Sequence, residues 1–571
     1  MGWRSAHDVR WSSPLQSHAR GLTFIIVADH GSMDIRPMCA SRRFASLEVF
    51  LVVALLVVVP LACTMYEVGA QQRRQYRDAN ALLHQQGDGG GHYLKAHLHS
   101  GDLVIFDPAW VMDTVTHRLE GNAKRYGVER APIAEGHVVL SFDSIAILET
   151  NRPIRSRDRN YRTTLITISV MNAVMTGYCV MNPKACFGSC PTFYLPGDEG
   201  LFSARAEGFS SAIYPALQYA DVDQLGVWAD DGEAPRVIMK NEALETQVVD
   251  RLWLEAFPVV DGEEVRMAPD GAFWRCSGPV PLSTARQDGK DVAAYLRADD
   301  GAEWWSRADT VDLRSTGTLE LSFERNTLGQ RPALAITFRQ TLLTTFLLYT
   351  ALGYMGNEVS DHIAGLEGDA ALRKRTAGEL HKLQDMRVEV MVNGRWQEVA
   401  VVRETGPIAR NRTVVPLPPL LDSEASIRLR LHHTPGMYRV DHAGLVDLCG
   451  EVIGERLSPA ALMDQEGCSV PGLVNVYDRD AHKLCTLPGD VHAVAFERPV
   501  GRSRQWHLFL GADGYYLEWM RREWLQHTDA DRLRAMLLGR DAEWRALTKE
   551  YKAMEEEMDA VFWNSQWTHP L

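Results

Sequence analysis

The feature that most constrains this chain is a long apolar run near its front. Two arginines, Arg42 and Arg43, precede the run, and from Val49 to Tyr66 no side chain is charged. A basic segment followed by an apolar one is the layout of a secretory leader. The uncharged run, about 18 residues long, also reaches the length at which one helix can cross a bilayer. The run therefore predicts that the rest of the chain folds outside the cytoplasm.

The apolar run ends in Pro60-Leu61-Ala62-Cys63. This ending resembles the lipobox of bacterial lipoproteins, in which a small residue precedes a cysteine that is lipidated and becomes the new N-terminus. The family usually has Leu three places before the cysteine, and here that place holds Pro60. The resemblance implies lipidation at Cys63 and a location in the bacterial cell envelope. A retained single N-terminal helix and plain secretion are the alternatives. The membrane is a partner of the lipidated form and of the form with a retained helix.

Composition narrows the class of the body. Hydrophobic residues make up 46% and charged residues 23% of the 571 residues, which is ordinary for a folded globular protein. The formal net charge is -14, and no basic stripe is present. Because phosphate backbones need such a stripe, nucleic acid is excluded as a partner.

The cysteines beyond the leader form two groups in the sequence. In an oxidising compartment their first interpretation is disulfides, and their odd number leaves one thiol unpaired. The disulfide candidates are Cys179, Cys186, Cys190, Cys276, Cys449, Cys468 and Cys485. Spacing excludes a C-x-x-C redox pair at Cys186 and Cys190, and a metal or redox centre that uses Cys179 with these two is the competing hypothesis. We expect no metal and no cofactor.

The segment from Cys186 to Pro191 reads Cys-Phe-Gly-Ser-Cys-Pro. It resembles a motif of uncharacterised secreted or lipid-anchored bacterial proteins, where it opens a β-rich domain. The resemblance implies a location and carries no activity.

The pattern predicts an α+β, β-rich chain of several domains. A small antiparallel sheet comes first, then an α+β region around a buried helix, then a jelly-roll-like β-sandwich with a helical tail. The expected divisions are a leader at 1–63, a tether at 64–92, a small β domain at 93–155, a central domain at 156–386, the sandwich at 387–512 and the tail at 513–571.

Three segments of the body carry the clearest periodicity. Thr318–Glu324 and Ala333–Phe338 alternate apolar and polar residues and suggest a hairpin. The apolar segment Thr341–Met355 predicts a core helix. Val388, Val390 and Val392 alternate with polar residues and lead into an Asn-Gly pair, which is typical of a type I′ turn.

The sandwich carries a second resemblance. The run Ile427–Leu431 and the segment Gly436–Asp441 are similar to galactose-binding-like sandwiches. The resemblance implies a domain that binds glycans or proteins through its loops.

The final helix shows a stripe of apolar side chains at spacings of three and four, which predicts packing against the sandwich, with self-association as the alternative. The stripe comprises Trp544, Leu547, Tyr551, Met554, Met558 and Val561, and Glu555, Glu556 and Glu557 are expected on the opposite face.

No local catalytic motif is present, so the catalytic residues are unknown. Three histidines, His92, His97 and His99, and the adjacent tryptophans Trp304 and Trp305 are better read as structural than as a metal or sugar site. We expect a membrane-anchored envelope protein with a non-catalytic binding or assembly role and a protein or glycan partner. The alternative is an envelope hydrolase, possibly directed at glycans, that uses two separated carboxylates.

Overall fold

The computed structural model describes residues 66–67, 70–72, 94–150, 154–155, 190–358, 382–469 and 483–568, apart from short gaps inside these ranges and single residues between them. The apolar run, Cys63, His92 and His99 lie outside the described residues. Within the part of the chain that is described, no helix has both the length and the apolar character needed to cross a bilayer.

The sheets are lettered in the order in which their first strands occur, and sheet A is the pair β1–β9. Sheet B is a small antiparallel sheet, as the sequence predicts. Its strands follow the order β2-β8-β3-β4-β6-β5, with β7 also paired to β6. Leu94, Phe106 and Leu119 lie in its core. Its strands are β2 (Ala70–Gln72), β3 (Leu94–Leu98), β4 (Leu103–Phe106), β5 (Val111–Asp113), β6 (Arg118–Tyr126), β7 (Pro132–Ser141) and β8 (Ile145–Thr150). A separate pair joins β1 (Tyr66–Glu67) to β9 (Ile154–Arg155).

Sheets C and D form a first sandwich around one apolar core. Sheet C comprises β10 (Thr192–Pro196), β11 (Phe202–Glu207), β13 (Arg236–Lys240), β28 (Pro459–Asp464), β30 (Val491–Phe496) and β32 (Trp567–Thr568). Sheet D comprises β12 (Tyr219–Ala229), β14 (Glu245–Pro258), β27 (Glu455–Leu457), β29 (Leu484–Thr486) and β31 (Gln505–Glu518).

Strand β31 lies between β12 and β14, so its backbone is paired on both edges. Nearly every one of its side chains is buried. Residues 513–518, expected at the start of the helical tail, therefore continue a central strand. Burial on both faces removes the period-two pattern by which a strand is recognised in a sequence.

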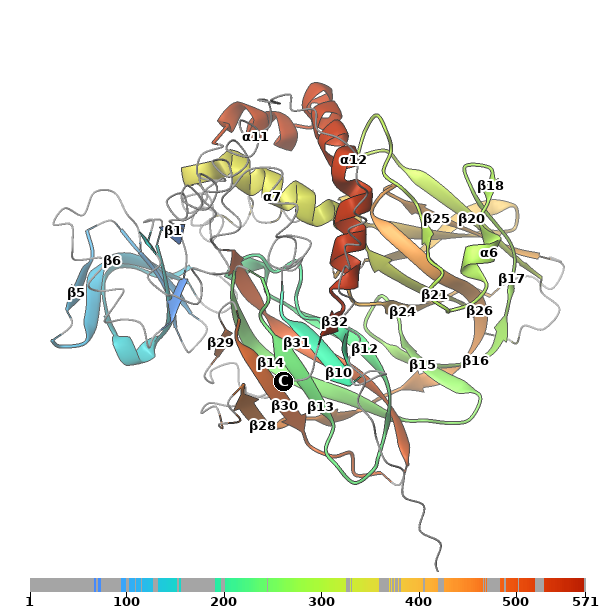
Figure 1. The fold of residues 1–571 in the computed structure, drawn as a ribbon, viewed down its shortest axis with the longest axis horizontal. Coiled ribbons are helices and arrows are strands. Elements are labelled where there is room, and N and C mark those ends of the chain that lie inside the picture. The colour runs from blue at the N-terminus through green and yellow to red at the C-terminus, as the bar shows by residue number, and fades with distance from the viewer. Residues whose placement is uncertain are drawn as a thin grey trace, which may run out of the picture. The chain divides into compact units, whose positions relative to one another are not determined.

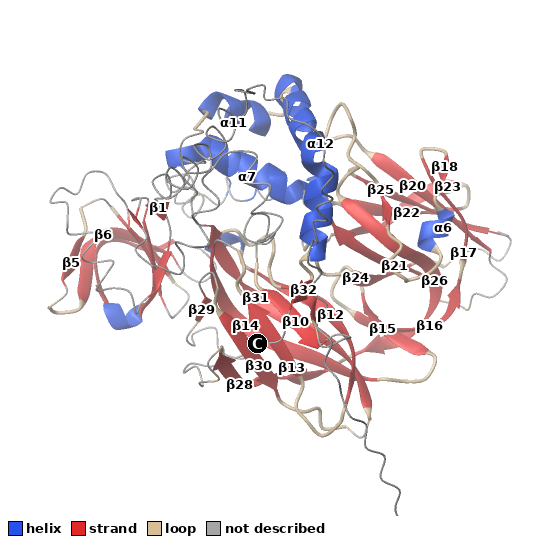
Figure 2. Cartoon of the chain, viewed as in Figure 1, coloured by secondary structure: helices blue, strands red, loops and turns tan. Residues whose placement is uncertain are grey.

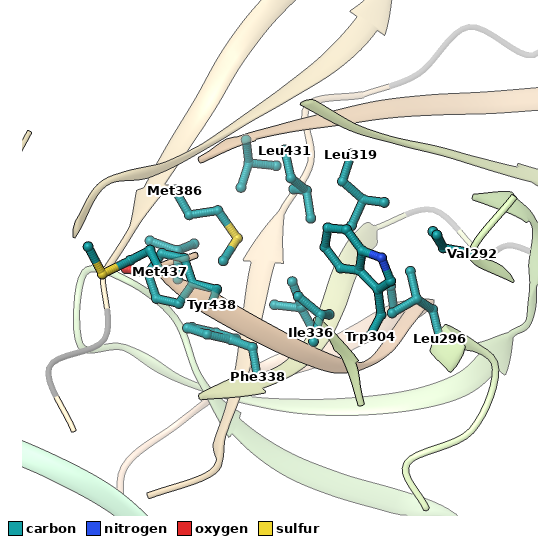
Figure 3. Packing of buried hydrophobic residues seen from close by; sticks show 14 of the residues in the cluster. Val292, Leu296, Trp304, Leu319, Ile336, Phe338, Met386, Leu431, Met437 and Tyr438 are labelled. Atoms are coloured by element: carbon teal, nitrogen blue, oxygen red, sulfur yellow. The ribbon is translucent and has the colours of Figure 1, made fainter. Parts of the chain in front are cut away.

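Sheets E and F form a second sandwich, and its core is drawn in Figure 3. There Leu319 and Leu431 of sheet F lie across from Ile336 and Phe338 of sheet E. Sheet E comprises β15 (Glu263–Met267), β16 (Phe273–Val280), β19 (Trp304–Trp305), β21 (Pro332–Gln340), β24 (Asn411–Pro416) and β26 (Tyr438–Val452). Sheet F comprises β17 (Leu282–Gln287), β18 (Lys290–Asp291), β20 (Gly317–Glu324), β22 (Met386–Val392), β23 (Arg395–Val402) and β25 (Ser426–His433).

The hairpin expected from 318–324 and 333–338 is wrong. Strand β20 pairs with β17 and β25 in sheet F, whereas β21 pairs with β24 and β26 in sheet E. The two strands are consecutive, yet each faces the other across the core. Strands from both sides of residue 386 share these sheets, since β25 pairs with β20 and β26 pairs with β21.

The turn expected after the valine strand is confirmed. Asn393 and Gly394 have φ angles of 52° and 74°, and they connect β22 to β23 with Val392 opposite Arg395. Positive φ at both central residues defines the type I′ turn, whose twist matches the flanking strands.

Among the described residues, three longer helices accompany the sheets and are blue in Figure 2: α7 (Leu343–Met355), α11 (Ala530–Leu537) and α12 (Asp541–Asn564). A short helix α6 (Ala293–Leu296) and the 3-10 turns Phe142–Ser144, Pro215–Leu217 and Gly356–Glu358 lie in connections. The expected core helix is α7, whose residues Leu343 and Leu347 join the E–F core. Its Phe346 ring lies 5.2 Å from the ring of Tyr551 in α12.

The buried face of α12 differs in part from the expected stripe. Trp544, Leu547, Tyr551 and Met558 are buried as expected, but Met554 is 41% exposed. Glu555, expected on the solvent face, is buried and accepts a hydrogen bond from the backbone N–H of Ala308 (2.6 Å). The helix thus packs on α7, which Figure 1 labels near it, and on the loop of the E–F sandwich that contains Ala308.

Candidate functional site

Sheet E closes on itself, and this closure creates the main candidate site. Strand β16 pairs with β15 on one edge and with β26 on the other, which completes a ring of β16, β15, β24, β21 and β26. Val265 and Met267 pack outside the ring with Phe257 and Phe273. Since side chains alternate along a strand, Arg266 between them faces the inside of the ring.

One half of the ring interior is apolar and the other half is charged. The apolar half comprises Ala268, Cys276, Ala333, Ala335, Val414, Val446 and Leu448. Further along the same strand faces come Thr337, Arg412 and His442, which the ladder places side by side. We call this charged end, with Glu264, Arg266, Asp299 and Asp441, the mouth of sheet E.

Two carboxyl groups meet at the mouth. Asp441, with 1% of its side chain exposed, is within hydrogen-bonding reach of Asp299. The backbone N–H of Gly301 donates to both oxygens of Asp441, at 2.9 and 3.1 Å. Thr337 Oγ1 donates to Asp299 Oδ2 (3.2 Å), and Arg412 Nη2 lies 2.8 Å from the same oxygen. These contacts fix the two carboxyl groups toward each other.

Burial, followed by the hydrogen bond with Asp299, raises the pKa of Asp441 to about 6. Arg410, whose Nη1 is 3.6 Å from Asp441 Oδ2, opposes this rise in pKa. Burial also lowers the pKa of His442, with Arg266 acting in the same direction, so its imidazole is neutral at pH 7. The mouth therefore combines a carboxyl that holds its proton up to nearly neutral pH with an uncharged histidine.

A second charged cluster fastens α12 to sheet E. Arg339, with 1% of its side chain exposed, donates from Nε to Glu303 at 2.9 and 3.0 Å. Its Nη2 lies 3.5 Å from Asp559, and its guanidinium lies 3.9 Å from the centre of the Trp563 ring. Arg439 Nη2 reaches Asp559 at 2.5 Å. Because each charge in this buried cluster has an opposite partner, we assign it a structural role.

The outer face of sheet F is the second candidate site. Trp396 is half-buried there, with the guanidinium of Arg430 at 4.0 Å and that of Arg428 at 6.0 Å from its ring centre. Beside them, His432 hydrogen-bonds to Glu389 through Nε2 (2.9 Å). An aromatic ring among cations and exposed polar groups is a surface that can contact a partner.

Three of the disulfide candidates are described with their side chains, and Cys190, Cys276 and Cys449 are free thiols. The disulfides expected of these three are therefore not formed among them. Cys190 is buried, and its thiol accepts a hydrogen bond from Ser210 Oγ (3.2 Å). Burial, with Glu207 and Glu245 nearby, raises the pKa of this thiol well above its usual value, which makes it unreactive. The remaining candidates lie outside the described residues or, for Cys485, have no described side chain.

The other residues that the sequence singled out are placed as follows. Within the described part of the chain no group of three or more potential ligands could hold a metal ion. Trp304 is buried in the E–F core, and Trp305 stacks under Arg439 at 4.0 Å. Asp441 and His442 are adjacent in the sequence, yet Asp441 turns to Asp299, and His442 Nδ1 is buried without a hydrogen-bond partner among the described residues.

Sequence reasoning missed the carboxyl pair and the mouth. Asp299 lies in a polar loop, and its contact with Asp441 spans more than a hundred residues. One signal was available only for the neighbouring cluster of Glu303 and Asp559: Arg339 directly follows Ala333–Phe338 in a strand, and a charge in such a strand is expected to have a buried partner.

Comparison with known proteins adds little to this geometry. No family model matches the chain, and no curated protein matches it. Among solved structures, it aligns with a cycloalternan-forming enzyme and the uncharacterized protein lmo2446, both from Listeria monocytogenes, at 10% identity and TM-scores of 0.15 and 0.13. Each alignment covers 63% of this chain and 29% of the other.

A GH31 alpha-xylosidase from Xanthomonas citri aligns at 6% identity with a TM-score of 0.14, over 73% of this chain and 36% of the other. The chain thus spans little more than a third of these proteins at most. TM-scores this low do not establish a shared fold.

Proposed function

We propose that this protein is a membrane-anchored component of the bacterial cell envelope with a non-catalytic binding role, and that the outer face of sheet F contacts its glycan or protein partner. The E–F sandwich then corresponds to the jelly-roll-like, galactose-binding-like domain suggested by the sequence. The observation that carries the binding role is Trp396 held between Arg428 and Arg430 on an exposed face.

The physical argument concerns what such a face offers a partner. An indole ring supplies a flat apolar surface, and flanking guanidinium groups supply fixed donors for hydroxyl or carboxylate oxygens. Arg430 is held by Glu320, to which its Nε and Nη2 donate at 3.1 and 3.0 Å. Arg430 is therefore positioned over the Trp396 ring before a partner arrives, which lowers the entropic cost of binding.

Binding is tested with the purified full chain on isolated envelope polysaccharide and on detergent extracts of the envelope. Trp396→Ala is expected to lower retention at least tenfold. The matched control is Trp567→Ala, because Trp567 is an exposed tryptophan (48%) on sheet C. Equal retention of both variants would reject sheet F as the binding face.

The envelope location is tested separately. Cells are fractionated with and without globomycin, which blocks removal of lipoprotein leaders, and the mass of the mature N-terminus is measured. A lipidated Cys63 supports the lipoprotein, an intact apolar run in the membrane fraction supports the anchor, and an unmodified soluble form in the cytosol would contradict both.

A hydrolase is the second candidate, and the observation that favours it is the carboxyl pair at the mouth. Two carboxyl groups that share a hydrogen bond lie closer than the roughly 5 to 9.5 Å that glycoside hydrolysis requires. Their chemistry instead matches a pair in which one carboxyl is protonated and the other activates water. Such an activity should fall as the pH rises through about 6, since the proton on Asp441 is then lost.

Asp299→Asn and Asp441→Asn test the hydrolase. A hydrolytic activity that survives both substitutions in folded protein would exclude the pair as its centre. Loss of activity with unchanged retention on envelope material would separate a catalytic mouth from a binding face on sheet F.

A further inference from the structure

The mouth of sheet E contains hydrogen-bond donors that lack acceptors. Arg266 Nη1 and Trp274 Nε1 are buried, and neither has a hydrogen-bond partner among the described residues. The two residues are opposite each other in the β15–β16 ladder, and both face the inside of the ring. Guanidinium and indole N–H groups can only donate, so the two atoms together call for an acceptor.

These donors are held firmly and cannot turn away. Arg266 is 5% exposed, and its Nε and Nη2 are both 3.0 Å from Glu264 Oε2. Its remaining nitrogen therefore has a fixed direction. An unsatisfied donor in a buried place costs free energy comparable to a lost hydrogen bond. Two unsatisfied donors on facing residues are rare in folded proteins. One acceptor that binds both donors accounts for them together.

His442 adds a third polar atom without a partner. Its Nδ1 is buried, and the imidazole is neutral, so it can donate from one ring nitrogen. The neighbouring Gly444 provides the space for this ring, because a Cβ at that position would lie 3.0 Å from His442 Cε1. His442 Nδ1 therefore lies beside Thr337 and Arg412 as a further polar atom that an incoming group could contact.

The charge of the mouth permits an anion as the acceptor. Arg266, Arg410 and Arg412 face Glu264 and the carboxyl pair, which carries a single negative charge while Asp441 holds its proton. Arg410 also lies 3.8 Å from Glu303, so the charges are nearly balanced, and the preference for an anion rests on the donor atoms that lack acceptors. Arg412 is 39% exposed and its Nη1 is 3.7 Å from Glu264, so the mouth reaches solvent and this contact can be exchanged.

We propose that the mouth of sheet E binds the oxyanion of a small ligand, a carboxylate or a phosphate group, which accepts hydrogen bonds from Arg266 and Trp274 and pairs with Arg412. The site is distinct from the Trp396 face on sheet F, and it does not require hydrolysis.

The test is calorimetric titration of the full chain with inorganic phosphate and, separately, with acetate, at pH 5.5 and constant ionic strength. Binding of at least one anion at a single site is expected. Trp274→Phe removes the N–H donor and keeps an aromatic ring, and it should weaken binding at least fivefold. Arg266→Gln should weaken it at least tenfold.

Arg387→Gln is the control, because Arg387 is an exposed arginine on sheet F. It should leave the affinity unchanged, and near-ultraviolet circular dichroism establishes that each variant is folded. Phosphate binding without acetate binding identifies a phosphate ligand, and the reverse identifies a carboxylate. The proposal is overturned if neither anion binds, or if Trp274→Phe and Arg266→Gln bind as tightly as the parent chain.

Discussion

Sheets E and F face each other across one core, yet the face of each sheet that points away from this core differs in its exposure to solvent. The outer face of sheet F is open, so β20 alternates buried Leu319, Leu321 and Phe323 with exposed or half-exposed polar residues. Sheet E closes into a ring, so all residues of β21 are buried, and its second face holds small and charged side chains. The comparison teaches that closure of a sheet, rather than its strand composition, decides where buried charges can be placed.

The largest expected effect is in the closed sheet. Arg339→Met removes the cation from between Glu303 and Asp559 and leaves both carboxylates buried. Breaking a buried ion pair by removing one partner costs about 3 to 5 kcal/mol. Chemical denaturation should show a loss of this size. A loss under about 1 kcal/mol would mean that the cluster is hydrated in solution.

A pH effect comes next and concerns the core side of sheet F. Burial lowers the pKa of His433 from 6.5 to about 4. The unfolded chain protonates this histidine below about 6.5 while the folded chain keeps it neutral. Stability should therefore decline as the pH falls from about 6.5 to about 4, by on the order of 3 kcal/mol.

The measurement for His433 is the free energy of unfolding across this pH range for the parent chain and for His433→Gln. The substitution removes the titrating group, so the difference between the two curves should change across this window. Curves that stay parallel from pH 7 to pH 4 would contradict the assignment.

The next largest effect is expected when a side chain in each sheet is enlarged and the loss of stability is compared. Ala335 lies inside the ring of sheet E with no exposed surface. Ala335→Leu overfills this space and should cost about 1 to 3 kcal/mol. Ser322→Leu, on the open face of sheet F, should change stability by no more than about 0.5 kcal/mol. Equal costs would mean that the ring is open in solution.

The smallest effect is expected at the surface of sheet F. Arg430→Met removes an exposed ion pair with Glu320, which is worth about 0 to 1 kcal/mol. It is the matched control for Arg339→Met, because the same side chain is replaced in each. Only the change in sheet E should produce a large shift of the denaturation midpoint.

The elements that the sequence predicted correctly are those with a local pattern in their own residues. The Asn393–Gly394 turn, the apolar helix now seen as α7 and the strands of sheet F all have a period or a turn signal of their own. The leader, the lipidation of Cys63 and the envelope location stay predictions.

What could not be predicted follows from pairing over long distances. Closure of sheet E joins Cys276 to Leu448, and the carboxyl pair joins Asp299 to Asp441. No local pattern records such contacts. The consecutive strands β20 and β21 suggested a hairpin because alternation shows which face of a strand is buried but not which neighbour it has. Glu555 was placed in solvent because a buried carboxylate is rare without a partner, and its partners are the backbone N–H of Ala308 and the ammonium group of Lys552.

The attachment of α12 has a consequence for how the chain is made. Ala308 contacts Glu555, and Arg339 contacts Asp559 and Trp563. These three residues of α12 emerge from the ribosome more than two hundred positions later. While the chain is being synthesised, the earlier strands lack these contacts with α12. A nascent chain that is stalled before residue 555 lacks these contacts and should therefore bind chaperones and be open to proteases.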